Sequence, residues 1–81
     1  MNNPDTDIYG NKRWFNHIGQ LHRDNGPAIE YANGSKVWIK NGKCHRINGP
    51  AIQYANGHKE YWINDKMYSS LEAYQMDLAL E

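Results

Sequence analysis

The sequence predicts a mainly β protein: a single sheet of about three tandem antiparallel β-hairpins, followed by one C-terminal α-helix. Three observations lead to this prediction. Residues 21–43 and 44–66 are two copies of one unit, Asn-Gly pairs stand between alternating apolar stretches, and the segment after residue 68 is rich in helix formers. A repeated unit of this kind stacks on its neighbours because it cannot bury its apolar side alone. Function is therefore expected on a repeated surface.

Length and composition exclude several classes of protein. A chain of 81 residues supports one modest core and one domain. Its single cysteine, Cys44, permits no disulfide within the chain, and the sequence contains neither a long apolar stretch nor a segment of the signal-peptide kind. We expect a cytoplasmic protein without a membrane span.

The formal charge is zero but unevenly distributed. Residues 12–46 carry seven bases and two acids, whereas residues 47–81 carry two bases and five acids. If the units stack in order, one end of the molecule is basic and the other acidic. This polarity could steer a partner or join two copies head to tail, or it could be a solvated surface without a role.

Each unit contains the pattern of a hairpin with a two-residue turn, at Asn33-Gly34 and again at Asn56-Gly57. Such a turn places Ile29 opposite Trp38, with Ile29, Tyr31 and Trp38 on one face of the sheet and Ala28, Val37 and Ile39 on the other. In the second unit Trp62 comes one residue later than this register requires. A β-bulge near Glu60 or Tyr61 would return it to its face.

The spacing of the tryptophans predicts a third, degenerate unit. Trp14, Trp38 and Trp62 are each 24 residues apart, although His22 and His45 are 23 apart. We therefore expect a row of tryptophans held in register across the sheet. The chain is divided into a degenerate first repeat at 9–20, repeats at 21–43 and 44–66, and a helix at 69–81, all within one domain of residues 1–81.

The helix is expected to begin with a capping box. In it the Ser69 hydroxyl accepts a hydrogen bond from the Glu72 N–H, and the Glu72 carboxylate accepts one from the Ser69 N–H. Leu71, Tyr74 and Leu78 share one stripe of this helix. The helix either covers the open edge of the last hairpin or binds a second copy or a partner.

The order Tyr-x-x-Gly, Trp, Asn-Gly-Lys-x-His and Gly, at Tyr31 to Gly49, resembles the MORN repeat. The chain departs from that repeat because Arg23 and Arg46 follow the histidines where glycine is usual, and because the glycine before the tryptophan is missing. It is more similar to a tandem HR-x-x-GPA variant found in proteins of phages and large DNA viruses. The resemblance implies a rod or curved sheet of hairpins that binds proteins, or for some MORN proteins anionic lipid, without catalysis. It also suggests a viral origin, and from a small protein of three units we infer an inhibitor of a host protein, acting against host defence.

Two interpretations apply to the repeated pairs His22-Arg23 and His45-Arg46. They could form a row that holds phosphate or carboxylate bidentately. Alternatively, the histidine hydrogen-bonds within the connector between hairpins and the arginine covers an aromatic ring. Trp, Tyr and Arg are also the residues of interface hot spots, and they recur here in register. The candidate binding residues are therefore His22, Arg23, His45, Arg46, Trp14, Trp38, Trp62, Tyr31 and Tyr54.

No residue set points to catalysis, and we expect no metal and no cofactor. The four histidines, at positions 17, 22, 45 and 58, have no carboxylate or cysteine at ligand spacing. Cys44 and His45, as neighbours in an extended chain, point to opposite sides. The leading hypothesis is a small binding module or inhibitor whose partner is a protein. One alternative is a receptor for an anionic small ligand such as a nucleotide, phosphoinositide or glycan phosphate. The other is a binder of single-stranded nucleic acid, but a chain with only nine basic residues is poorly suited to that role.

Overall fold

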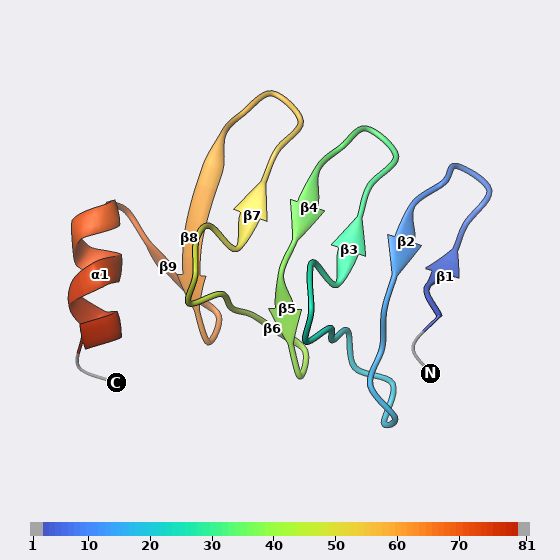
Figure 1. Cartoon of the computed structure of the whole chain (residues 1–81), viewed down its shortest axis with the longest axis horizontal. Helices are drawn as coiled ribbons and strands as arrows, with labels where there is room; N and C mark the ends of the chain where they lie inside the picture. The colour runs from blue at the N-terminus through green and yellow to red at the C-terminus, as the bar shows by residue number, and fades with distance from the viewer. Residues whose placement is uncertain (1–2, 80–81) are drawn as a thin grey trace.

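The computed structural model describes residues 3–79, which form a thin antiparallel sheet with one helix at its C-terminal end (Figure 1). The molecule as a whole measures 39 × 30 × 16 Å. Seven strands form one sheet in the order β1-β2-β3-β4-β7-β8-β9, and β5 and β6 form a second, two-stranded sheet. The predicted fold class, β-hairpins followed by a helix, is confirmed. The elements are β1 (Asp5–Thr6), β2 (Lys12–Arg13), β3 (Ile29–Glu30), β4 (Lys36–Val37), β5 (Ile39–Lys40), β6 (Lys43–Cys44), β7 (Ile52–Gln53), β8 (Lys59–Ile63), β9 (Lys66–Tyr68) and α1 (Leu71–Ala79).

The upper turns in Figure 1 contain three residues, so the predicted two-residue turns at Asn33-Gly34 and Asn56-Gly57 are wrong. The Gly34 N–H donates to the Tyr31 carbonyl and the Tyr31 N–H donates to the Ser35 carbonyl, at 3.0 and 2.8 Å. Gly34 has a φ of 98°, while Asn33 is not among the positive-φ residues and its Oδ1 accepts from the Ser35 N–H. This is a type I turn followed by a left-handed glycine, which an Asn-Gly pair accommodates as well as a type I′ turn.

The longer turn shifts the register by one residue. Ile29 lies opposite Val37, not opposite Trp38, and Ile52 lies opposite Glu60. A shift of one residue moves every side chain of a strand to the other face. The predicted grouping of Ile29 and Tyr31 with Trp38 is therefore wrong.

The lower turns explain why the tryptophan and histidine spacings differ. Two of them are true two-residue turns with positive φ at both positions: Asn41 at 49° and Gly42 at 81°, then Asn64 at 49° and Asp65 at 69°. The first lower turn is longer by one residue, since the Asn16 N–H donates to the Gln20 carbonyl. The extra residue in the first turn accounts for the step of eight residues from Trp14 to His22. The predicted bulge near Glu60 or Tyr61 is absent from β8, which pairs without interruption with β7 and β9.

The chain segments between hairpins, 23–27 and 46–50, are called here the connectors, and the side of the sheet against which they lie is the connector face. Their arginines identify this side, because Arg23 contacts both Trp14 and Glu30. Opposed residues of neighbouring strands share a face. A different row therefore occupies the opposite face: Asp5, Arg13, Ile29, Val37, Ile52 and Glu60 are successive cross-strand partners.

Side-chain hydrogen bonds join each upper turn to the next. The Asn11 Oδ1 accepts from the Ala32 N–H at 2.8 Å, and the Ser35 Oγ accepts from the Ala55 N–H at 2.9 Å. Asn11 and Ser35 both stand directly after the left-handed glycine of their turns. Each turn therefore orients its successor, and Ser35 is buried although it is polar.

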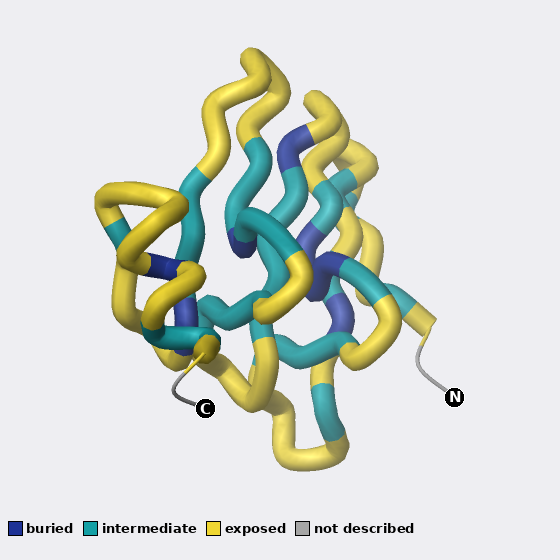
Figure 2. Tube along the Cα trace, turned by 60° about the vertical axis from the view of Figure 1, so that its left-hand side comes forward, coloured by how far each residue is buried: buried dark blue, intermediate teal, exposed yellow. Residues whose placement is uncertain are grey.

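Burial is concentrated at mid-height, while the turns at both ends are exposed (Figure 2). Within residues 3–79 the buried apolar residues are few, and the two alanines of the GPA segments have no exposed surface. Most of this packing is a thin layer between the sheet and the connectors, while Ile29 is buried on the opposite face. This set comprises Trp14, Ala28, Ile29, Ala51, Ile63 and Tyr74.

The helix α1 packs against β8 and β9 (Figure 1). Its cap is Ser70, whose Oγ accepts from the Ala73 N–H at 3.1 Å, so the predicted capping box of Ser69 and Glu72 is wrong by one residue. The helix begins at Leu71, and the last two residues of the predicted range, 80 and 81, lie outside the described residues. Among residues 3–79 no helix has the length and apolar character needed to cross a bilayer.

Candidate functional site

The arginine of each connector lies flat over an aromatic ring. The Cζ atoms of Arg23 and Arg46 are both 3.8 Å from the ring centroids of Trp14 and Trp38, respectively. Each guanidinium also donates through Nη1 to the carbonyl of the connector proline, at 3.2 Å for Pro27 and 3.0 Å for Pro50. Cation–π attraction and a charged hydrogen bond therefore hold each connector onto the sheet.

The glycine of each connector makes room for this arginine. A β-carbon at Gly26 would come within 3.2 Å of the Arg23 Cζ, and one at Gly49 within 3.2 Å of the Arg46 Nη1. Gly49 also has a φ of 152°, which favours glycine. The repeated Arg-x-x-Gly-Pro spacing is explained by this contact: the glycine faces the guanidinium and the proline carbonyl accepts from it.

The histidine before each arginine accepts a hydrogen bond from the lower turn at the end of its own unit. His22 Nδ1 accepts from the Asn41 N–H at 2.9 Å, and His45 Nδ1 accepts from the Asn64 N–H at 3.1 Å. An imidazole that accepts through Nδ1 carries its proton on Nε2. In His22 that nitrogen lies 3.1 Å from Asp24 Oδ1. Both histidines thus occupy structural positions, in which each ties the start of its unit to the lower turn at the end of that unit.

The aromatic row under the connectors consists of Trp14, Trp38 and Tyr61. The backbone defines these equivalents, since the Trp14 and Trp38 carbonyls accept from His22 and His45, and Tyr61 pairs with Tyr68 in the same place. The predicted position of Trp62 in this row is wrong. Its indole Nε1 instead donates to Glu60 at 3.1 Å, on the opposite face.

Tyr74 of α1 packs on Tyr61, the third ring of the aromatic row. Its ring lies 4.9 Å from that of Tyr61 and 6.1 Å from that of Tyr68. Tyr74 is 3% exposed, and its hydroxyl lies 3.0 Å from the Gly49 carbonyl. Burial raises the pKa of this phenol. Within the predicted stripe of Leu71, Tyr74 and Leu78, the central residue therefore faces its own sheet, while Leu71 is 46% exposed.

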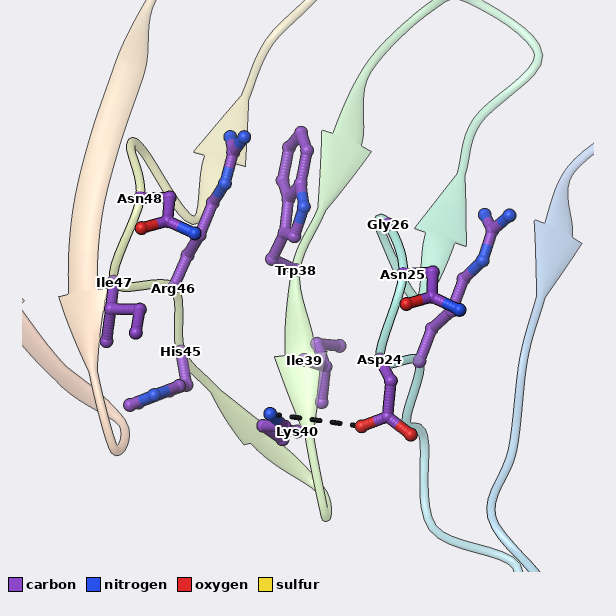
Figure 3. Close-up of a pocket in the computed structure, with 11 residues that line it drawn as sticks. Asp24, Asn25, Gly26, Trp38, Ile39, Lys40, His45, Arg46, Ile47 and Asn48 are labelled. Carbon is purple, nitrogen blue, oxygen red and sulfur yellow. Dashed lines mark ion pairs between the residues drawn. The ribbon is translucent and has the colours of Figure 1, made fainter.

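A groove of about 500 Å³ separates the two connectors (Figure 3). Trp38 and Ile39 lie at its middle, with the first connector on one side and the second on the other. Asn25 and Asn48, which stand at equivalent positions of the two connectors, both line the groove. Its further lining residues are Arg23, Asp24, Gly26, Lys40, His45, Arg46 and Ile47.

The opposite face presents aromatic side chains. Tyr31 and Tyr54 stand at equivalent positions of successive units and are 38% and 41% exposed. Tyr54 is placed on this face by its contact with Glu60, whose carboxylate accepts from the Tyr54 hydroxyl at 3.4 Å. The candidate binding residues are thus divided between two surfaces: the histidines, arginines, Trp14 and Trp38 belong to the connector face, whereas Tyr31, Tyr54 and Trp62 belong to the opposite face.

Cys44 is half-buried, and its pKa is raised to about 12 by burial and by the nearby Asp65 and Glu60 carboxylates. Its backbone N–H donates to Asp65 Oδ1 at 2.7 Å. The thiol is therefore protonated at neutral pH, which disfavours nucleophilic attack. In the portion of the chain that the structure describes, no group of three or more histidine, cysteine or carboxylate side chains is positioned to hold a metal.

Sequence reasoning did not include Tyr61 and Gly49 among the binding candidates, and it assigned Tyr74 to the helix stripe without predicting its contact with the second connector. The 23-residue period does point to Tyr61, because it is the period partner of Trp38, but the chemical identity of Trp62 was the stronger signal. Tyr74 lies outside the repeats, and no local pattern places it on the second connector.

Comparisons with known proteins add no assignment: no family model matches the chain, and no curated protein or solved structure matches it significantly.

Proposed function

We propose that this protein is a non-enzymatic binding module that recognises a protein partner through the opposite face of its sheet. The observation that carries this proposal is the repeated exposure of Tyr31 and Tyr54, which are 38% and 41% exposed. Tyrosine supplies a large contact area with little loss of side-chain freedom, and it is enriched in interface hot spots.

The surroundings of these rings support the same role. Ile29, Val37 and Ile52 are consecutive cross-strand partners on this face and form an apolar strip beside the two tyrosines. The main contacts of α1 are with β8 and β9, and within the strip Val37 and Ile52 are partly exposed while Ile29 is buried. An apolar centre with a charged border is typical of a protein interface, and Arg13 and Glu60 flank the apolar strip on its two sides.

The resemblance of the unit to the MORN repeat agrees with a binding role. A partner from a host cell, and inhibition of that partner, belong to this proposal as its more specific form. The repeated position of Tyr31 and Tyr54 suggests a partner surface that engages both units at once, about two strand spacings or roughly 10 Å apart.

The test is affinity capture of a partner, its identification, and titration of the purified pair by calorimetry. The double variant Tyr31→Ser/Tyr54→Ser should weaken binding at least tenfold, since each truncation removes a candidate hot spot. Tyr9→Ser is the matched control, because Tyr9 is 75% exposed at a turn tip, and it should leave the affinity unchanged. Unchanged affinity of the double variant, with its circular dichroism intact, would refute this use of the opposite face.

A further inference from the structure

The groove on the connector face has an excess of positive charge that comes from Arg46. The other two cations of its lining have acidic partners: Arg23 Nη1 lies 3.3 Å from Glu30 Oε2, and Lys40 Nζ lies 3.8 Å from Asp24 Oδ1. Within residues 3–79, no carboxylate lies within 4.0 Å of the Arg46 guanidinium.

The sequence explains this asymmetry between two otherwise equivalent arginines. Glu30 and Gln53 stand at the same position of successive units, opposite Lys36 on its two sides. The unit that holds Arg23 therefore supplies a carboxylate, and the unit that holds Arg46 supplies a neutral amide. Arg46 donates one hydrogen bond, to Pro50, so further N–H groups of its five-donor fork remain for a ligand.

Two amides beside Arg46 also have unused hydrogen-bonding groups. In the described part of the chain, the side chains of Asn25 and Asn48 make no hydrogen bond, and both line the groove (Figure 3). An asparagine amide carries a donor and an acceptor, which match the C=O and N–H of a peptide group. The groove thus offers one site for a carboxylate and two for a peptide backbone.

The shape of the groove favours an extended chain over a small ion or molecule. It is open along the surface and spans two connectors, whereas small-ligand pockets enclose most of their ligand. Equivalent positions of neighbouring units are separated by two strand spacings, about 10 Å, which an extended peptide covers in about three residues. A peptide that crosses the groove would place residues i and i+3 at equivalent positions.

We propose that this groove is a second binding site, which takes an extended acidic peptide whose carboxylate pairs with Arg46 and whose backbone lies against Asn25 and Asn48. This site lies on the connector face and does not depend on the protein-binding role proposed for Tyr31 and Tyr54 on the opposite face.

The test is an NMR titration of the isotope-labelled protein with a blocked peptide of three Glu-Ser-Thr triplets. The indole signal of Trp38 and the side-chain amide signals of Asn25 and Asn48 should shift. The matching peptides with Gln or Lys in place of Glu should bind at least tenfold more weakly, because the bidentate pair with Arg46 is lost. Added salt should weaken the Glu peptide most.

The decisive variant is Gln53→Glu, which should give Arg46 the internal partner that Glu30 gives Arg23. Because it retains the Arg46–Trp38 stack, the fold should persist while affinity for the Glu peptide falls at least tenfold. Tyr54→Ser, on the opposite face, should leave the titration unchanged. Equal binding of the three peptides, unaltered binding by Gln53→Glu, or shifts at Tyr31 and Tyr54 instead of Trp38 would overturn the proposal. Binding of inorganic phosphate as tight as that of the Glu peptide would overturn the assignment of a peptide.

Discussion

The hydroxyl of Tyr74 donates to the backbone carbonyl of Arg46, 28 residues earlier in the chain. This bond joins the C-terminal helix to the second connector, whose arginine in turn lies on Trp38. The helix thus ends the aromatic row at Tyr61, where a further repeat would require another connector. It acts as the terminal cap that repeat architectures need.

Tyr74→Phe should destabilise the protein by about 1–2 kcal/mol, because the Arg46 carbonyl loses its partner in a buried position. The raised pKa of Tyr74 also predicts a pH effect. The pKa of Tyr74 is higher in the folded state than in the unfolded chain. The stability that the protonated Tyr74 hydroxyl contributes is therefore fully present below about pH 10, and it is lost as the pH rises through the folded-state pKa. Urea unfolding at neutral and alkaline pH measures both effects. Tyr9→Phe, at an exposed turn, is the control, and an identical pH dependence in Tyr74→Phe and the parent protein would contradict the prediction.

Gly49→Ala should cost more stability than Gly57→Ala. Both glycines have positive φ, at 152° and 94°, but only Gly49 would direct its β-carbon within 3.2 Å of the Arg46 Nη1, while Gly57 has nothing within 4 Å. We expect about 1 kcal/mol for Gly57→Ala from backbone strain alone and about 2–3 kcal/mol for Gly49→Ala. Denaturant unfolding gives both values. In an Arg46→Ala background the difference between the two glycine variants should shrink, and a constant difference would show that the guanidinium is not its cause.

His45→Asn and His45→Gln should separate the role of Nδ1 from that of the ring. In His45→Asn the amide oxygen Oδ1 takes nearly the same position as the histidine Nδ1 and can still accept from the Asn64 N–H. In His45→Gln the amide oxygen is one bond farther from the backbone. We expect His45→Gln to cost roughly 1–2 kcal/mol more than His45→Asn. Hydrogen exchange of the Asn64 amide should accelerate only in His45→Gln. Equal exchange in both variants would mean that another group protects this turn.

The Cys44 thiol should react slowly in the folded protein. With its pKa raised to about 12, the thiolate is scarce at pH 8, while the unfolded chain has an ordinary cysteine. Modification by a disulfide reagent should be at least tenfold slower in buffer than in concentrated urea. Asp65→Asn should speed the reaction modestly, since this carboxylate is the second cause of the raised pKa. Comparable rates with and without urea would contradict a protected thiol.

The repeat and its hairpins were predictable because their signals are local. Asn-Gly pairs and alternating apolar residues each depend on a few neighbouring residues, and the 23-residue period can be seen directly because the two copies are nearly identical. Turn length was not predictable, since Asn-Gly suits two turn types. Asn41-Gly42 forms the two-residue turn, whereas Asn33-Gly34 belongs to the three-residue turn. The hydrogen bond from the Ala55 N–H to Ser35, 20 residues away, is compatible with the second type and lies beyond any local pattern.

The sequence by itself determined that the chain forms β-hairpin repeats, that a helix follows them, and where the repeated His-Arg pairs stand. Tertiary structure alone decided that Tyr61 rather than Trp62 lies in the aromatic row and that Tyr74 covers it. It also decided that Arg46 lacks the carboxylate that Arg23 has. The physical reason is that these contacts depend on strand register and on residues from separate units, and a shift of one residue reverses the face to which each side chain belongs.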